Sequence, residues 1–244
     1  MTLAAGWYGK IPSLGDFASR RLPAEFIGTW DRWLQHSMAA SRATLGERWL
    51  DAYMTSPIWR FALMPQTVDA GAWAGLLMPS IDRVGRHFPL TLALRLAPDG
   101  HGDRATMILS SDPWFAALEK IALAALDVGF SADDLERELT RLPFPPGDDS
   151  GSGDDQAADA LADWWLHPSA VPQAIRLPPG RSALEILTGT AQRILDASSV
   201  GKSIWWSVPG DSGTTEVNLF AGLPPQDSFA GLLLGGDWRE QPRA

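Results

Sequence analysis

Three short strings in the sequence contain residue types that enzymes use in catalysis. The first, Gly210-Asp211-Ser212-Gly213, matches the setting of a chymotrypsin-type nucleophilic serine. A serine of that type needs a histidine base and a carboxylate that orients the histidine. The chain has four histidines and none has a comparable setting: His36, His87, His101 and His167. A Pro-Gly-Asp-Ser-Gly string between two candidate strands is typical of a turn, so we predict a turn here.

The second string, Gly201-Lys202-Ser203, resembles the end of a phosphate-binding P-loop. The first glycine of that motif would fall at position 196, which is occupied by Asp196. The residues that follow, Ile204-Trp205-Trp206, predict a strand. A P-loop requires the N-terminus of a helix at that point, because helical N–H groups bind the phosphate. The sequence therefore argues against a nucleotide site here.

The third string, Asp99-Gly100-His101-Gly102, is similar to a metal-binding string of PPM-type protein phosphatases and follows a candidate strand. A two-metal site needs several carboxylates, and only Asp103 and Asp112 follow closely. Strings of glycine, aspartate and histidine also commonly form hairpin turns. We keep a metal-dependent, phosphatase-like hydrolase as an alternative, and we predict no metal ion and no cofactor.

Two irregular segments combine glycine, proline, aromatic and charged residues: residues 6–21 and residues 78–89. We expect neither to form a buried element. Loops of this composition often carry function, and arginine beside aromatic residues is typical of protein interfaces. We predict a partner-binding surface made of Trp7, Lys10, Asp16, Arg20, Arg21, Asp82, Arg83 and Arg86. The alternative is that Asp16 and Asp82 cap helices or pair with these arginines and so fix the loop geometry.

Helices that would support this surface are predicted from apolar spacing and capping residues. Apolar residues recur every three or four positions over residues 26–38, and a second short helix is predicted over residues 45–53. Asp112-Pro113 fits an N-cap followed by a first-turn proline. Ser131 with Asp134, and Ser182 with Glu185, have the spacing of a capping box.

Short apolar runs between the helices are candidate strands, because glycine, proline or aspartate bounds them. They cover residues 58–64, 73–78, 88–96, 104–109, 203–208, 216–220 and 229–234. Short links between consecutive runs imply hairpins, which pair antiparallel. We predict an α/β fold, a three-layer α-β-α sandwich with a mostly antiparallel or mixed central sheet.

The domain organisation follows from one low-complexity segment. Residues 143–156 read PFPPGDDSGSGDDQ, and their proline, glycine and repelling aspartates predict a mobile acidic loop. We find no repeat at solenoid or propeller periods. We therefore predict a single domain over residues 1–240 that carries this loop.

Composition excludes several classes of function. The 244-residue chain has a net charge of −9 and no basic stripe, so nucleic acids are poor partners. It has no cysteine, which excludes disulfides and thiolate-bound metals. The longest unbroken apolar run, residues 121–126, is too short to cross a bilayer, and the N-terminus lacks the apolar core of a signal peptide. We expect most of the twelve tryptophans in the core.

Four strings carry a family resemblance: GWYGKIPSLGDFASRRLP, FIGTWDRWLQ, SPIWRFAL and WAGLLMPSIDRVGRHFPLTLA, all within residues 6–96. Together they resemble the TagF family, also called ImpM, of type VI secretion-associated proteins. A looser similarity extends over residues 205–238, in the pattern WW, GLP, F, LL and GDW.

The resemblance implies a cytoplasmic α/β sandwich domain without an established catalytic activity, and it supplies no catalytic residues. It implies a post-translational repressor of type VI secretion that binds the forkhead-associated scaffold protein Fha, beside a threonine kinase and phosphatase pathway. We therefore expect a non-enzymatic regulator with Fha as its partner. A structural component of the secretion baseplate is the alternative that the same family context suggests. The sequence leaves the oligomeric state open.

Overall fold

A seven-stranded sheet forms the centre of the molecule in this computed structural model, which describes residues 4–96, 108, 111–144, 156–167, 182–207 and 217–236. The strands are β1 (Gly6–Gly9), β2 (Ala18–Arg20), β3 (Trp59–Leu63), β4 (Trp73–Met78), β5 (Leu90–Arg95), β6 (Lys202–Ser207) and β7 (Val217–Ala221). They lie in the order β2-β1-β5-β4-β3-β6-β7, and each of these pairings is antiparallel. The prediction of an α/β protein with a mostly antiparallel sheet is confirmed.

The helices begin largely where the sequence signals them, although the helix predicted to have Asp112 as its N-cap has Ser111 there instead. They are α1 (Ala24–Leu45), α2 (Trp49–Thr55), α4 (Asp112–Ala124), α5 (Ala132–Arg141), α6 (Gln156–Leu166), α7 (Ala183–Ser198) and α8 (Phe229–Leu233), with 3-10 turns η1 (Gly46–Arg48) and η3 (Gln226–Ser228). Both predicted capping boxes are present at the starts of α5 and α7. α1 ends at Gly46, whose φ of +54° favours glycine.

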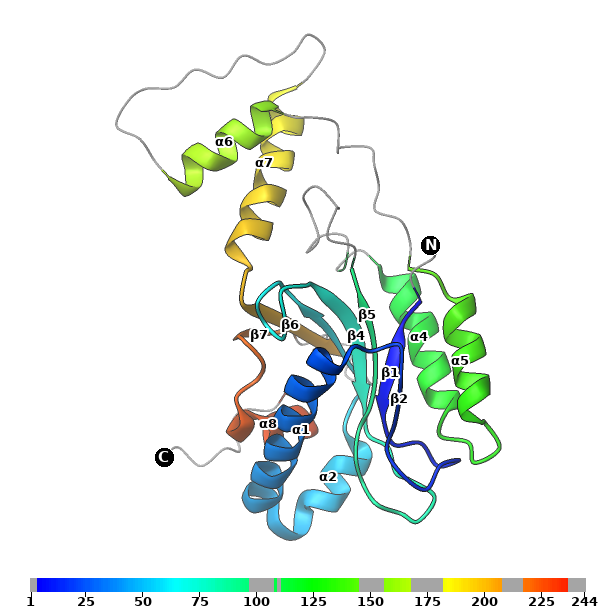
Figure 1. The fold of residues 1–244 in the computed structure, drawn as a ribbon. Coiled ribbons are helices and arrows are strands. Elements are labelled where there is room, and N and C mark those ends of the chain that lie inside the picture. The colour runs from blue at the N-terminus through cyan, green and yellow to red at the C-terminus, as the bar shows by residue number, and fades with distance from the viewer. Residues whose placement is uncertain are drawn as a thin grey trace.

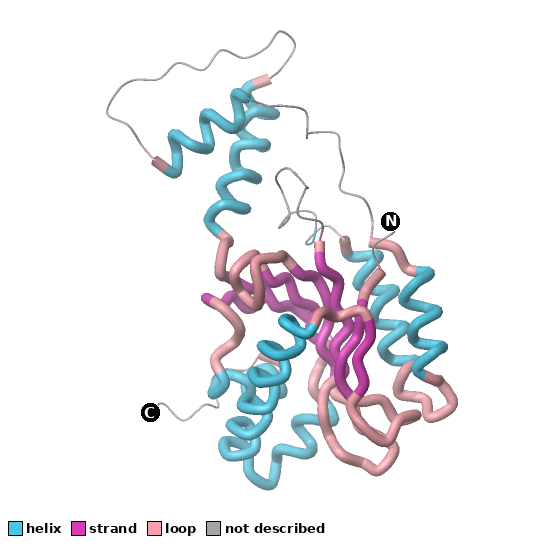
Figure 2. The backbone as a smooth tube through the Cα atoms, viewed as in Figure 1, coloured by secondary structure: helices cyan, strands magenta, loops and turns pink. Residues whose placement is uncertain are grey.

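Helices cover both faces of the sheet (Figures 1 and 2). One hydrophobic cluster includes Trp114 and Leu118 of α4 and Leu135 of α5. The other includes Trp30 of α1 and Phe229 of α8. The inner strands β4 and β5 are almost entirely buried on both sides, so they appear as nearly unbroken apolar runs in the sequence.

Tryptophan dominates this core, as the composition predicts. The largest fully buried side chains include Trp7, Trp30, Trp59, Trp73 and Trp205. Trp30 is central, because its ring lies within about 6 Å of the rings of four other aromatic residues. These side chains serve to pack the core rather than to present a platform for a ligand.

Four elements differ from the sequence prediction, and one of them is β2, because residues 18–20 were expected to be irregular. Residues 229–234 form α8 instead of a strand, because buried apolar residues occupy all sides of this short segment and leave no readable period. Residues 6–9 form the buried strand β1, although the segment was expected to be irregular. Residues 156–166 form α6, which pairs with α7 outside the sheet (Figure 1).

Some expectations fall outside the described residues. These include the strings at 99–102 and 210–213, the candidate strand 104–109 except residue 108, and residues 145–155 of the acidic loop. Ile108 is helical, so the predicted strand is wrong at that residue. The P-loop-like string is described: Gly201 forms a turn and β6 begins at Lys202, so a strand follows where a P-loop needs a helix. Among the described residues, no helix is long and apolar enough to span a membrane.

Candidate interaction surface

Two hairpin loops meet at one end of the sheet (Figure 1). Residues 10–17 connect β1 to β2, and residues 79–89 connect β4 to β5; because β1 lies beside β5, the loops are neighbours. We call them the loop pair. They approach closely because residue 9 is glycine: its φ is +132°, and a Cβ there would lie 2.1 Å from Pro89 O.

Hydrogen bonds join the two loops directly. Arg83 N donates to Leu14 O at 2.8 Å. Arg86 Nη2 donates to Gly15 O at 2.6 Å. Contacts of this kind, from backbone to backbone and from guanidinium to backbone, give the two loops one fixed relative position.

Asp82 is the centre of the loop pair and is only 1% exposed. Its Oδ2 accepts hydrogen bonds from Lys10 Nζ at 2.9 Å and from Arg86 Nε at 2.7 Å. Its Oδ1 accepts from the backbone N–H groups of Val84 at 3.0 Å and Arg86 at 2.9 Å. Burial alone would raise the pKa of Asp82, but these hydrogen bonds outweigh burial and hold the pKa well below its usual range.

The lowered pKa of Asp82 predicts a stability that depends on pH in the acid range. An aspartate has an unfolded-state pKa of about 3.9. Because the folded-state value lies below it, the stabilisation is present above that pH and is lost as the pH falls through the folded value. We expect the difference in melting temperature between the wild type and Asp82→Asn to be constant near neutral pH and to narrow below about pH 4. Thermal unfolding followed by circular dichroism measures it, and a constant difference in acid would contradict the prediction.

Helix α2 packs against residues 79–89, the longer loop of the loop pair. The Tyr53 hydroxyl donates to Ser80 O at 2.8 Å and accepts from Ser80 N at 2.9 Å. Burial raises the pKa of Tyr53, so the hydroxyl stays protonated and keeps donating. Trp49 stacks on Tyr53, and His87 packs edge-on against both rings. This support was not predicted, because its only signal in the sequence is two aromatic residues one helical turn apart.

The outer side of the loop pair presents cations beside apolar groups. Phe17 is 45% exposed and Val84 is 67% exposed. The ring of Phe17 also lies 4.7 Å from Lys10 Nζ, so a cation–π contact holds it in place. Arg83 is exposed and makes no side-chain hydrogen bond or ion pair within the described part of the chain. The Arg86 side chain is half exposed although Asp82 anchors it.

A second group of the predicted residues lies at the β2 edge, against α5. Trp7 Nε1 donates to Glu136 Oε1 at 2.7 Å, and Arg21 forms an ion pair with the same carboxylate. Arg21 has a φ of +62°, which is uncommon for arginine, and its contacts hold it there. Arg20 pairs with Asp133 at the surface. These contacts connect β1, β2 and the residue that follows β2 to α5.

The eight residues predicted to bind a partner therefore do not form one exposed surface. Trp7, Lys10 and Asp82 are buried, so they position their neighbours and cannot contact a partner directly in this structure. Their burial argues against direct contact with a partner, and the sequence does not reveal it because the sequence does not show that β1 and the base of the loop pair lie inside the protein. Asp16, Arg20, Arg21, Arg83 and Arg86 are exposed.

The alternative prediction, that aspartates fix the loops, is confirmed for Asp82. It is wrong for Asp16, whose Oδ1 accepts from Phe17 N at 2.8 Å and which pairs with no arginine in the described part of the chain. The sequence analysis also left Phe17 and Val84 out of the surface. Their signal was an apolar residue in a polar, glycine-rich loop, which is a typical position for an interface residue.

The catalytic alternative finds no support in the described residues. They contain no group of three or more histidine, aspartate or glutamate side chains that could hold a metal ion. Asp112, one of the candidate ligands, instead forms an ion pair with Arg60 at 2.9 Å, and Arg60 also pairs with Glu119 at 2.7 Å. These bridges tie α4 to β3. The other two candidates, Asp99 and Asp103, lie outside the described residues.

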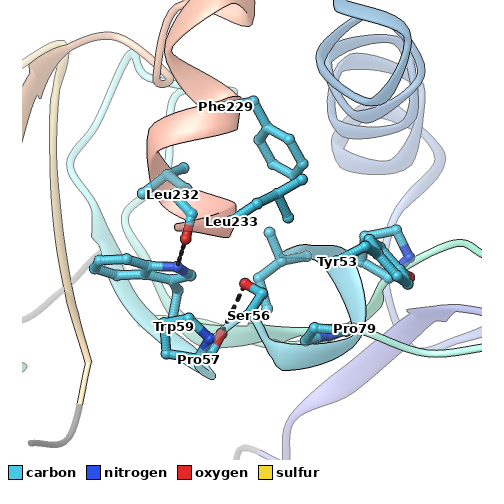
Figure 3. Close-up of a pocket in the computed structure, with 10 residues that line it drawn as sticks. Tyr53, Ser56, Pro57, Trp59, Pro79, Phe229, Leu232 and Leu233 are labelled. Atoms are coloured by element: carbon cyan, nitrogen blue, oxygen red, sulfur yellow. Dashed lines mark hydrogen bonds between the residues drawn. The ribbon is translucent and has the colours of Figure 1, made fainter. Parts of the chain in front are cut away.

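An apolar pocket lies behind the loop pair, between α2, α8 and the ends of β3 and β4 (Figure 3). Trp59 Nε1 donates to Leu232 O at 2.9 Å across it, and Ser56 Oγ donates to Pro57 O. Its remaining lining is almost entirely proline, leucine and aromatic side chains. The side chains that line it pack α8 against the sheet.

Comparison with known protein families identifies the chain. A family model described as the TagF N-terminal domain, type VI secretion system-associated, matches residues 6–142. The chain belongs to the TagF family. Both loops of the loop pair lie inside the match, as do α1, α2, α4 and α5.

A solved structure supports the same relationship over almost the whole chain. This TagF protein is similar to PA0076 from Pseudomonas aeruginosa PAO1, whose crystal structure superposes with a TM-score of 0.72. The two chains are 34% identical, and the match covers 94% of each. A search of curated proteins finds no match. The association of this TagF protein with type VI secretion therefore rests on the family model.

Proposed function

We propose that this TagF protein is a non-enzymatic, post-translational repressor of type VI secretion that acts in the cytoplasm by binding the scaffold protein Fha through the loop pair. The observation that carries the proposal is the buried Asp82, which holds two cations and two backbone N–H groups and so fixes an exposed arginine and two exposed apolar side chains in one arrangement. Family membership supports the link to secretion.

A preformed loop pair suits binding because less conformational entropy is lost on association. Arginine and aromatic residues are enriched among residues that dominate binding energy. Arg83 and Phe17 supply these residue types on one surface, Arg86 lies beside them, and the exposed Val84 adds apolar area. Lys10 and Asp82 have the supporting role of positioning residues within the same unit.

Charge reversal at Arg83 tests the proposal. We expect Arg83→Glu to weaken recovery of Fha at least about ten-fold, which is the size typical of a residue that dominates an interface. The melting temperature should hold, because Arg83 makes no side-chain ion pair with the described residues. Co-purification of Fha with the tagged protein from cells measures the effect.

The matched control is Arg95→Glu, because Arg95 is an exposed arginine at the C-terminal end of β5, and the loop pair joins the opposite end of that strand. It makes the same change in charge and should leave Fha recovery unchanged. Equal recovery with Arg83→Glu and the wild type would reject the loop pair as the binding site. Recovery of baseplate subunits without Fha would reject Fha as the partner.

A further inference from the structure

The strand β7 is an open edge of the sheet. It pairs with β6 on one side, and no described strand pairs with its other side. Proteins usually protect such edges with charged residues, proline or bulges, because an edge offers free hydrogen-bonding groups to another strand. β7 reads VNLFA and contains no charged residue and no proline.

The register of β7 on β6 decides which of its backbone groups face outward. Gly222 N donates to Gly201 O at 2.6 Å, which makes these two residues a hydrogen-bonded pair at the end of the ladder. In an antiparallel ladder, residues that bond the neighbour alternate with residues that do not. The residues of β7 whose N–H and C=O groups point to the open edge are therefore Val217, Leu219 and Ala221.

The same three residues expose their side chains. Leu219 is 71% exposed, and Val217 and Ala221 are exposed beside it. Their side chains project on the face of the sheet that carries Ile204 and Trp206 of β6, which pack on the α4 cluster. This edge is uncharged, and the same three residues carry both its free backbone groups and its exposed apolar side chains. Such an edge can bind a further strand through backbone hydrogen bonds and apolar contacts.

We propose that β7 pairs antiparallel with β7 of a second copy of this chain, on a two-fold axis through Leu219. In this register Leu219 lies opposite Leu219 of the second copy, and Val217 lies opposite Ala221. Each opposed pair consists of residues whose N–H and C=O groups face outward, so each pair can exchange both hydrogen bonds. The two sheets then become one continuous sheet.

The lack of charge on β7 is compatible with a second copy of the same strand, because β7 offers no ion pair that would select a charged strand. The molecule carries a net charge of −9, which opposes self-association in general. The uncharged β7 is a place where two copies can meet without bringing like charges directly opposite each other. Leucine opposite leucine and valine opposite alanine are compatible cross-strand pairs on the exposed face.

Cysteine cross-linking tests the register, because the chain contains no cysteine of its own. Opposed residues in a hydrogen-bonded pair have Cα atoms about 5.5 Å apart, a distance that a disulfide spans. We expect Leu219→Cys to form a covalent dimer under mild oxidation at least about ten-fold faster than Leu187→Cys. Leu187 is the matched control, because it is an equally apolar, exposed leucine on α7.

Sedimentation of the full chain provides the second measurement. The wild type should shift from 26.4 kDa toward twice that mass as its concentration rises. Leu219→Pro removes one outward N–H without breaking a bond to β6, so it should stay monomeric. A wild type that is monomeric at every concentration, or equal cross-linking at positions 219 and 187, would overturn the proposal. A dimer that Leu219→Pro leaves intact would also overturn it.

Discussion

Replacing Asp82 with alanine should lower the melting temperature by roughly 10 °C. The Lys10 ammonium is 4% exposed and loses the carboxylate that neutralises it. Arg86 loses the acceptor of its Nε, and the backbone N–H groups of Val84 and Arg86 lose theirs. Removing one partner of a buried ion pair is far more costly than replacing both, because the other charge stays buried.

A double variant separates the cost of leaving Lys10 charged and buried from the other losses of stability in Asp82→Ala. Lys10→Met combined with Asp82→Asn removes both charges and keeps side chains of similar size. We expect the double variant to be more stable than Asp82→Ala and to recover a large part of the lost melting temperature. Thermal unfolding followed by circular dichroism measures both variants. A melting temperature of Asp82→Ala within about 2 °C of the wild type would contradict the central role of Asp82.

Replacing Trp30 with alanine should reduce the free energy of unfolding by about 3–5 kcal/mol, the range for large aromatic residues in a core. Trp30 is fully buried, and its Nε1 donates to Thr91 Oγ1 at 2.8 Å. Its ring packs on Phe26, Phe61 and Trp205, which come from a helix and two strands. The substitution would therefore leave a cavity where α1 meets the sheet. The Thr91 hydroxyl would also lose the hydrogen bond that it accepts from Trp30 Nε1.

The matched control is Trp165→Ala, because Trp165 lies mostly exposed on α6. The same substitution there should change the free energy of unfolding by less than about 0.5 kcal/mol. Urea unfolding followed by far-ultraviolet circular dichroism compares the two variants, since tryptophan fluorescence changes with either substitution. Similar losses at positions 30 and 165 would contradict the assignment of Trp30 to the centre of the core.

Several elements could be read from local sequence because local interactions determine them. The capping boxes at Ser131 and Ser182 fix the starts of α5 and α7 through hydrogen bonds within one turn. Apolar spacing placed α1, and short links between apolar runs predicted the antiparallel pairing of β3 with β4 and of β6 with β7. α8 could not be read in this way, because a short segment buried on all sides has no period.

The candidate surface was predicted only in part. Its two segments were identified by composition, and Arg83 and Arg86 lie at the exposed positions that an interface needs. The sequence did not separate these residues from Lys10 and Asp82, which have the same residue types and lie inside. Burial depends on which strand lies beside which, and β1 lies beside β5, more than 80 residues away in the chain.

By itself, the sequence determined the α/β class, the starts of α5 and α7, the tryptophan-rich core and the TagF relationship, because each depends on residue types at short spacing. Only the tertiary structure decided that residues 10–17 and 79–89 form one unit around Asp82, and that β7 lies at an open edge. The physical reason is that strand order and the pairing of buried charges depend on contacts between distant residues. A one-dimensional pattern does not specify such contacts.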